Sequence, residues 1–168
     1  MRYFLLFIIA TFNINAYAYE KLDIEFQSLD SQEQSEILCL AQNIYFESVG
    51  EPLNGKMAVG MVTMNRVSSD RYPDSVCGVV KQKVKKYCQF SWYCDETKRI
   101  KKNQISQSKH FDEILDMSLY IYLRYTSIKD VSQGATHFHA TRINPGWHDL
   151  KRTVSIGQHV FYKPKQKR

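Results

Sequence analysis

Glu47 is the side chain whose surroundings best suit proton transfer. It stands at the end of an apolar, helix-patterned stretch, directly before the turn-forming residues Gly50 and Pro52. A carboxyl in this position is partly removed from water and close to the negative end of a helix dipole, and both effects raise its pKa. A carboxyl with a raised pKa can act as a general acid at neutral pH. Glu51 is a candidate second carboxylate. From spacing alone, Glu47 and Glu51 could equally be ordinary surface acids.

Two histidines form the second candidate group. His137 and His139 are two positions apart, and on a strand such residues share a face and can converge on one ligand. Together with His159 or a carboxylate they could form a zinc site. The chain lacks an H-E-x-x-H motif, so we favour histidines that bind substrate or are buried and hydrogen-bonded, and we expect no metal.

A polar loop carries the third group, which consists of Gln89, Phe90, Ser91, Trp92 and Tyr93. Exposed aromatic rings stack against sugar rings, while glutamine and serine side chains bond hydroxyl and N-acetyl groups. A small hydrophobic cluster beneath the loop would explain the same aromatic residues. The loop is therefore a candidate sugar-binding site with a purely structural alternative.

A helix over residues 32–48 is predicted to carry Glu47 at its C-terminal end. Its apolar residues recur at helical spacing, and they are Ile37, Leu38, Ala41, Ile44 and Tyr45. Two capping boxes compete at its start, an S-x-x-Q at 31–34 and a D-x-x-E at 30–33. Gly50 suits a left-handed cap after the last turn.

The rest of the chain is predicted to form helices first and a small sheet last. The predicted helices cover 55–68, capped by Asn54, 75–82 and 108–126, and the predicted strands cover 135–140 and 159–163. Residues 83–108 are predicted to be a long basic loop, which in a compact domain is functional or disordered. Helices followed by a small sheet indicate an α+β domain built around one core.

The composition is that of one ordinary globular domain. The 168 residues are 43% hydrophobic and 24% charged, which argues against a disordered chain and against a protein with several membrane spans. The formal net charge of +6 attracts polyanions without selecting one. No stripe of lysine and arginine interleaved with aromatic residues is present, so we expect no nucleic-acid partner.

The N-terminus has the pattern of a secretory signal peptide. Arg2 is followed by an apolar stretch at 4–10 and by an A-x-A-like site at 16–18. We expect cleavage after Ala18, because the stretch is shorter than the roughly 20 residues of a membrane span. The mature protein would then be exported to the periplasm, the cell wall or the medium, and would be tethered to the membrane only if the signal stayed uncleaved.

Four cysteines lie in the mature part of the chain: Cys39, Cys77, Cys88 and Cys94. An oxidising compartment permits disulfides, and four cysteines allow three complete pairings. Cys39 falls within an apolar helical pattern, where a buried free thiol is expected. We prefer one bridge among the other three. The absence of C-x-x-C pairs argues against a zinc knuckle.

Six blocks of the sequence resemble, in order, the signature of the SleB/CwlJ-type cell-wall hydrolases, known from spore-cortex-lytic enzymes. The blocks are 40–52 (LAQNIYFESVGEP), 58–60 with 65–67, 76–80, 88–92 with 94–95, 134–140, and 156–157 with 159–162. The resemblance spans about 39–163. Together with the residue patterns, it divides the chain into an expected signal peptide (1–18), a lead-in (19–30), a SleB-like catalytic domain (31–163) and a basic tail (164–168).

The resemblance implies a lysozyme-like fold, mainly helical, related to the lytic transglycosylases. It places the catalytic role on Glu47, beside Ser48 as in the Glu-Ser pair of soluble lytic transglycosylases. The residues that would line the glycan cleft are Ser48, Gln89, Phe90, Ser91, Trp92, His137 and His139. The expected partner is the glycan strand of peptidoglycan. With no room expected for a separate wall-binding domain, the basic surface would hold the wall, as suits a general wall-remodelling enzyme or a phage endolysin.

The expected mechanism needs no cofactor. Glu47 protonates the glycosidic oxygen between N-acetylmuramic acid and N-acetylglucosamine, and then deprotonates either water or the 6-hydroxyl of the sugar. The lack of an evident second carboxyl favours the transglycosylase route, while Glu51 keeps hydrolysis by a muramidase open. The rival hypotheses are a zinc amidase or peptidase using His137, His139 and His159, and a non-catalytic wall-binding protein.

Overall fold

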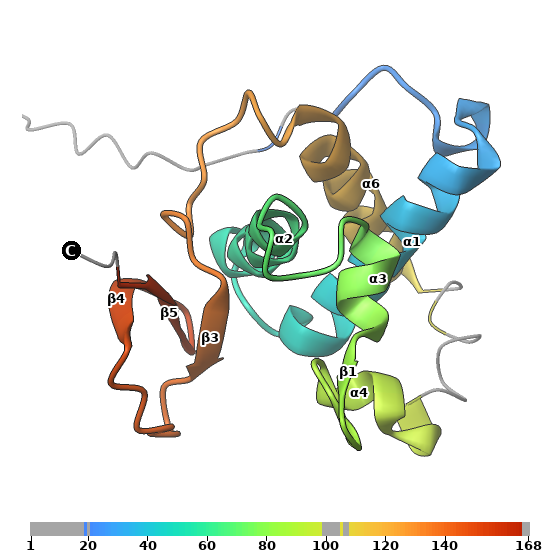
Figure 1. The fold of residues 1–168 in the computed structure, drawn as a ribbon. Coiled ribbons are helices and arrows are strands. Elements are labelled where there is room, and N and C mark those ends of the chain that lie inside the picture. The colour runs from blue at the N-terminus through green and yellow to red at the C-terminus, as the bar shows by residue number, and fades with distance from the viewer. Residues whose placement is uncertain (1–18, 20, 99–104, 106–107, 166–168) are drawn as a thin grey trace, which may run out of the picture.

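Helices dominate the described part of the chain, and a small sheet lies on one side of them (Figure 1). The computed structural model describes residues 19, 21–98, 105 and 108–165. Its helices are η1 (Phe26–Ser28), α1 (Ser31–Ser48), α2 (Leu53–Val67), α3 (Val76–Lys81), α4 (Ser91–Cys94) and α6 (Lys109–Arg124). Its strands are β1 (Lys83–Val84), β2 (Tyr87–Cys88), β3 (His137–Ala140), β4 (Leu150–Ile156) and β5 (His159–Pro164). The predicted α+β class is confirmed.

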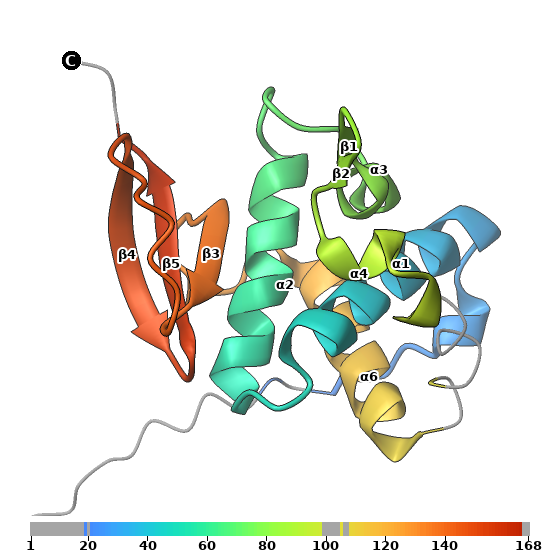
Figure 2. The same ribbon diagram turned by 90° about the horizontal axis from the view of Figure 1, so that it is seen from below.

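Helix α2 lies between the three-stranded sheet and the other helices, as both ribbon views show (Figures 1 and 2). Most of its residues are buried, which suits a helix with apolar or small side chains round most of its circumference. At Gly60 a Cβ would lie 2.7 Å from Cδ1 of Ile121 in α6 and 3.0 Å from Cδ1 of Ile44 in α1. The lack of a side chain at Gly60 therefore lets α2 pack closely against α1 and α6.

The N-terminus of α1 is capped by Asp30 and Glu33. Oδ1 of Asp30 accepts the backbone N–H groups of Gln32 and Glu33 at 2.8 Å, and the Glu33 carboxylate accepts the N–H of Asp30. The D-x-x-E box is therefore the one that forms. The alternative cap at Ser31 is wrong, because Ser31 is already the first residue of the helix.

The turn between α1 and α2 differs from its prediction at both ends. Val49 caps α1 in the right-handed helical conformation, and Gly50 is not among the glycines with a positive φ, so the left-handed cap is wrong. Asn54, the predicted cap of α2, lies inside its first turn, and the N-cap is Pro52. The Pro52 carbonyl accepts the N–H of Gly55 at 2.8 Å, so the fixed φ of proline starts the helix without a side-chain cap.

Helices α3 and α6 confirm the predictions for 75–82 and 108–126. Each is capped by a serine, because Oγ of Ser75 accepts the N–H of Gly78 at 3.1 Å and Oγ of Ser108 accepts that of Phe111 at 3.2 Å. A side-chain cap thus fixes where each of these helices begins.

The loop predicted over residues 83–108 contains regular structure in the part that the structure describes. Strands β1 and β2 pair antiparallel around a turn in which Lys85 has a φ of 56°. Helix α4 follows, and a disulfide joins Cys88 to Cys94 across it. Two-residue strands and a single helical turn are too short to show periodicity in a sequence, so the loop prediction is wrong here.

The C-terminal sheet has the strand order β3-β5-β4 with antiparallel pairing throughout. Strands β3 and β5 correspond to the predicted strands, and β5 continues one residue further, to Pro164. Strand β4 was not expected. Its register with β5 shifts between Arg152 and Ser155, and this irregularity breaks the alternation by which a strand is recognised.

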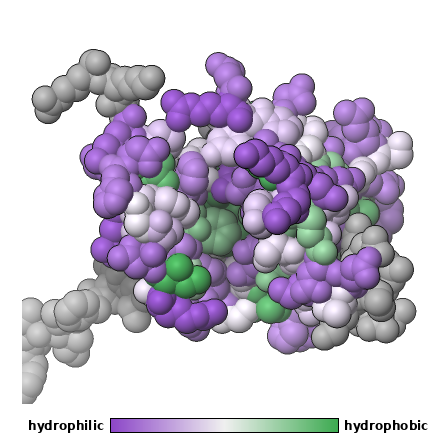
Figure 3. Space-filling view, turned by 60° about the horizontal axis from the view of Figure 1, so that its bottom comes forward, coloured by the Kyte–Doolittle hydropathy of each residue, from purple (hydrophilic) through white to green (hydrophobic). Residues whose placement is uncertain are grey.

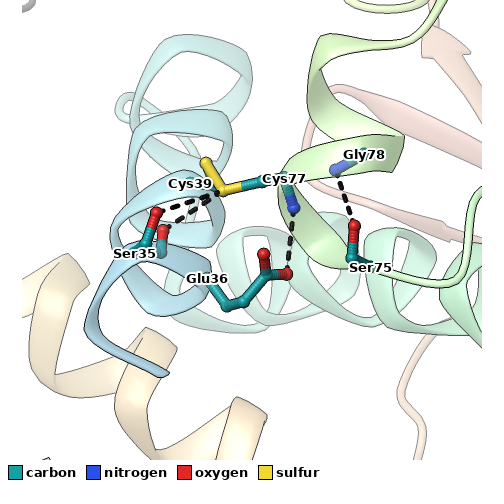
Figure 4. The surroundings of a disulfide bond; sticks show 6 residues. All are labelled: Ser35, Glu36, Cys39, Ser75, Cys77 and Gly78. Atoms are coloured by element: carbon teal, nitrogen blue, oxygen red, sulfur yellow. Dashed lines mark hydrogen bonds between the residues drawn. A yellow bond between two sulfur atoms is a disulfide. The ribbon is translucent and has the colours of Figure 1, made fainter. Parts of the chain in front are cut away.

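Two disulfides form among the four cysteines. The bridge expected among the later three is confirmed as Cys88–Cys94, whereas the free thiol expected at Cys39 is wrong. Cys39 in α1 bonds instead to Cys77 at the start of α3, and Figure 4 shows the two helices meeting at this bond. The apolar stripe of α1 that suggested a buried thiol is the surface against which α3 packs.

The residues before α1 lie along α6. The hydroxyl of Tyr19 donates to the carbonyl of Glu113 at 3.1 Å, and Lys21 forms an ion pair with Asp116 at 3.3 Å. The expected signal peptide, 1–18, lies outside the described residues. None of the helices in the described part of the chain combines the length and apolar character needed to cross a membrane.

Candidate active site

Glu47 lies in the last turn of α1 and lines a cavity of about 240 Å³ between the helices and the sheet. The helical side of this cavity is formed by residues 46–51, and the sheet side by Ala140, Arg142, Gln158 and His159. We call it the Glu47 cavity. The face shown in Figure 3 is hollowed at its centre, where hydrophobic surface lies between hydrophilic rims.

A buried hydrogen-bond network holds α1 in place one turn before Glu47. The Asn43 side chain donates to Oγ1 of Thr63 in α2 at 3.1 Å and accepts the indole N–H of Trp92 in α4 at 2.9 Å. The Trp92 ring stacks on Phe46 with 4.6 Å between ring centroids. Because buried polar groups are costly unless paired, this network fixes the three helices relative to one another.

The Glu47 carboxyl is partly removed from solvent. Burial raises its pKa above the ordinary value of 4.5, and the positive charges of Lys98 and Arg66 lower it again in part. Desolvation penalises the charged form, so the neutral acid persists to a higher pH than in an exposed glutamate. The direction of this pKa shift is the one that a general acid needs.

Arg66 is the cation that lies deepest near this site, with 3% of its surface exposed. Its guanidinium lies over the rings of Tyr72 and Phe90, at 5.3 and 5.1 Å from their centroids, and its Nε donates to the carbonyl of Thr136 at 2.7 Å. Nη1 is buried and has no partner among the described residues. Arg66 therefore connects α2 to the start of the sheet while placing a positive charge near Glu47.

Glu51 connects the turn after α1 to the turn between β4 and β5. Its Oε2 accepts the backbone N–H of Gln158 at 2.8 Å. The neighbouring Gly157 has a φ of 56°, and a Cβ at this position would collide with the same oxygen of Glu51. The carboxylate predicted as a second catalytic group thus has a structural contact at the rim of the Glu47 cavity.

Ser48 lines the Glu47 cavity but is 2% exposed. Its hydroxyl donates to the carbonyl of Ile44, one turn earlier in α1, at 2.7 Å. The donor that a sugar would use is therefore already engaged within the helix.

Phe90 and Trp92 of the 89–93 segment are buried in the protein, and Tyr93 is half-buried. Phe90 is 3% exposed beneath Arg66, and Trp92 is 2% exposed in the Asn43 network, so the expectation that their rings are available to sugars is wrong. Gln89 is half-buried and Ser91 is exposed, and neither lines the Glu47 cavity. Their predicted contact with the glycan stays a prediction.

His137 and His139 lie together on one face of the sheet, outside the Glu47 cavity. The Trp147 ring contacts both, at 5.5 Å from each centroid, and Nε2 of His139 is 3.1 Å from the Tyr162 hydroxyl. Burial lowers the pKa of His137, and the charge of Arg66 lowers it further. Their predicted role in substrate binding stays a prediction.

His159 lies on the opposite face of the same sheet. It pairs with Ala140, whereas His139 pairs with Val160, and directly paired residues share a face. The three histidines of the zinc hypothesis are therefore not brought together. Within the described residues, no group of three or more histidine, cysteine, aspartate or glutamate side chains is placed to hold a metal ion.

Sequence reasoning missed Asn43, Arg66 and Arg142 as parts of the site, and it considered His159 only as a possible zinc ligand. Asn43 had a usable signal, because it is a polar residue on an otherwise apolar helix face. Arg66 and Arg142 had none, because only the packing of the sheet against α2 and the end of α1 brings them near Glu47.

The sequence profile described as Cell Wall Hydrolase matches residues 50–162 of the chain. The spore cortex-lytic enzyme of Bacillus subtilis (strain 168) is 44% identical over 46 residues, which are 27% of this chain and 15% of that enzyme. The spore cortex-lytic enzyme of Oceanobacillus iheyensis is 43% identical over 47 residues, 28% of this chain and 17% of that enzyme. The matched region thus spans less than a fifth of these relatives.

Two solved structures have the same fold. The catalytic domain of the germination-specific lytic transglycosylase SleB from Bacillus anthracis aligns with a TM-score of 0.57 and 23% identity, covering 80% of this chain and 99% of that domain. The catalytic domain of the Bacillus cereus SleB protein aligns with a TM-score of 0.54 and 21% identity, covering 84% and 99%. The predicted SleB-like, lysozyme-like fold is confirmed.

Proposed function

Because the chain belongs to the cell wall hydrolase family, we propose that it cleaves the glycan strands of peptidoglycan, with Glu47 as general acid and then general base. The observation that carries the proposal is a desolvated carboxyl that lines a cavity between helices and sheet. Such a carboxyl keeps the proton that a glycosidic oxygen must receive. The names of the similar spore cortex-lytic enzymes and of the SleB lytic transglycosylase support the same chemistry.

The reaction begins when neutral Glu47 donates its proton to the oxygen between N-acetylmuramic acid and N-acetylglucosamine. The bond to the muramic anomeric carbon breaks, and an oxocarbenium-like charge develops on that sugar. Glu47, now a carboxylate, takes a proton from the oxygen that attacks the anomeric carbon. The positive charges of Lys98 and Arg66 favour this carboxylate, so the same group can serve in both halves of the reaction.

The attacking oxygen in our proposal is the 6-hydroxyl of the muramic residue, which gives a 1,6-anhydro end. Hydrolysis by a retaining or inverting route requires a second carboxylate to attack the sugar or to activate water. The candidate in the same cavity, Glu51, already accepts the Gln158 N–H through one oxygen. The intramolecular route needs only Glu47 and is therefore the better supported of the two.

Mass spectrometry of the products of purified peptidoglycan tests the proposal. Anhydromuramyl ends, one water lighter than reducing ends, are the expected result. Reducing muramic ends would contradict the transglycosylase route and indicate a muramidase, and reducing glucosamine ends would indicate a glucosaminidase. Released stem peptides would contradict glycan cleavage and favour an amidase or peptidase. A folded protein that binds the wall but yields no soluble product would support the non-catalytic alternative.

The pH dependence of kcat/KM should have an alkaline limb set by Glu47. Activity needs the protonated acid, so it falls as pH rises through a pKa that lies above 4.5. Lys98→Gln removes a charge that lowers this pKa, so the limb should move to higher pH. Added salt should move the limb of the unmodified protein in the same direction, because it screens Lys98. A limb that Lys98→Gln leaves in place would argue against Glu47 as the titrating acid.

The place of action in this proposal is the cell wall, outside the cytoplasm. Peptidoglycan is an exported polymer, and an enzyme that cleaves it must reach that compartment. The signal peptide expected at 1–18 would provide the route, and the two disulfides suit an oxidising environment.

A further inference from the structure

Among the described residues that line the sheet side of the Glu47 cavity, Arg142 carries a positive charge. It follows the end of β3, while Glu47 comes from α1 on the helical side. The backbone on either side of Arg142 is anchored, because Thr141 N–H donates to the Gln158 carbonyl at 2.8 Å and Ile143 N–H to the Ala140 carbonyl at 2.9 Å. These backbone hydrogen bonds fix the position in the chain from which the Arg142 side chain extends.

The Arg142 guanidinium is available to a ligand. The residue is exposed, and among the described residues its side chain has neither an ion pair nor a hydrogen bond. The other charged group on this rim, Glu51, already accepts a backbone N–H. Burial lowers the pKa of His159, which disfavours its charged form. The positive charge available on the sheet side of the cavity is thus that of Arg142.

A guanidinium at this position selects for a carboxylate on the substrate. Its planar N–H groups match the two oxygens of a carboxylate and bind them as a pair. In a peptidoglycan glycan, the carboxyl group of the sugar chain is that of the lactyl ether on C3 of the muramic residue. It is charged only where no stem peptide is attached and no lactam has formed. The same sugar supplies the anomeric carbon that must lie beside Glu47.

We propose that Arg142 is a specificity-determining residue that binds the free lactyl carboxylate, so that glycan stripped of stem peptides is the preferred substrate. This inference rests on the proposed function, and it specifies which form of the glycan binds in the Glu47 cavity. Reactions that remove stem peptides would then supply the substrate of this enzyme.

The test compares denuded glycan strands with the same strands after conversion of the lactyl carboxylate to its neutral methylamide. The unmodified protein should cleave the denuded strands about 10- to 100-fold faster in kcat/KM, as expected for a charge-assisted hydrogen-bonded pair. Arg142→Gln should abolish this preference by lowering kcat/KM on the denuded strands to that on the methylamide, while Arg142→Lys should keep part of it. Lys151→Gln, which removes an exposed cation on β4 outside the cavity, is the matched control and should keep the full preference.

The outcomes separate this inference from the proposed function. Equal cleavage of both glycans by the unmodified protein, or a preference that survives in Arg142→Gln, would overturn the role of Arg142 and leave glycan cleavage standing. Failure to cleave either glycan would contradict the proposed function. Binding of the two glycans to Glu47→Gln, measured by calorimetry, keeps the inference testable without turnover, because a 10- to 100-fold weaker affinity for the methylamide is expected again.

Discussion

Glu47→Gln is expected to lower the rate of glycan cleavage about 10³-fold, within the range that positioned proton transfer contributes in enzymes. Glutamine keeps the size and the hydrogen-bonding capacity of the side chain but cannot donate or take the catalytic proton. Its neutral amide also suits a position where burial already favours the uncharged form of the carboxyl. The variant should therefore fold normally, with a free energy of unfolding within about 1 kcal/mol of the unmodified protein.

Glu51→Gln is the matched control, because it makes the same chemical change four residues later in the same cavity. Glutamine at this position keeps an acceptor for the Gln158 N–H but loses its charge. We expect cleavage within a few-fold of the unmodified rate and a loss of about 1 kcal/mol of stability. If Glu51→Gln instead stopped cleavage while Glu47→Gln retained it, the catalytic assignment would be wrong. Initial rates on purified peptidoglycan and urea unfolding measure both effects.

The position of Glu47 could be predicted because it depends on local patterns. The apolar stripe of residues 32–48 indicates a helix, and the turn signals at Gly50 and Pro52 indicate where it ends. The structure ends α1 at Ser48, in agreement with that prediction. A carboxyl on the last turn of a packed helix is then partly buried by the neighbouring elements, which is the origin of its raised pKa.

The surroundings of Glu47 could not be predicted because they depend on long-range packing. Trp92 and Phe90 lie in a polar segment, yet the single turn of α4 and the Cys88–Cys94 bridge direct both rings inward. A charged residue such as Arg66 carries no sign in the sequence that its guanidinium will be buried between two rings. The segment expected to bind sugar is thus in large part core.

The sheet side of the site was predictable only in outline. Strands β3 and β5 have recognisable composition, but β4 is irregular and was missed, and with it the β4–β5 turn that Glu51 contacts. The spacing of His137 and His139 suggested a shared ligand, yet the strand register places His159 on the other face from His139. The pairing of strands decides which side chains share a face of the sheet, and the spacing of residues along one strand does not reveal that pairing.

Removal of the Cys39–Cys77 disulfide should cost more stability than removal of Cys88–Cys94. The two cysteines of the first bridge are 38 positions apart and those of the second 6 apart. In the chain-entropy description, a bridge stabilises by restricting the unfolded chain, and the effect grows with the length of the closed loop. It corresponds to about 4 kcal/mol for the longer loop and about 2 kcal/mol for the shorter one.

The native contacts around Cys39–Cys77 also favour a larger loss of stability on removal of this disulfide than on removal of Cys88–Cys94. The Cys77 N–H at the start of α3 donates to the Glu36 carboxylate of α1 at 3.1 Å, so the bond and the hydrogen bond join the same two helices (Figure 4). Loss of the disulfide therefore loosens the contact between α3 and α1, and α1 is the helix that carries Glu47. The Cys88–Cys94 bridge, by contrast, closes a local loop around α4.

The measurement is urea unfolding of Cys39→Ala/Cys77→Ala and of Cys88→Ala/Cys94→Ala, each beside the unmodified protein. The first double variant should lose about 4 kcal/mol and the second about 2 kcal/mol, and a reducing agent should bring the unmodified protein below both. Equal losses in the two variants would contradict the dependence on loop length, because the native environments would then dominate. A single domain has only about 5–15 kcal/mol of stability in total. The longer bridge therefore accounts for a large share of what keeps α1, and with it Glu47, in place.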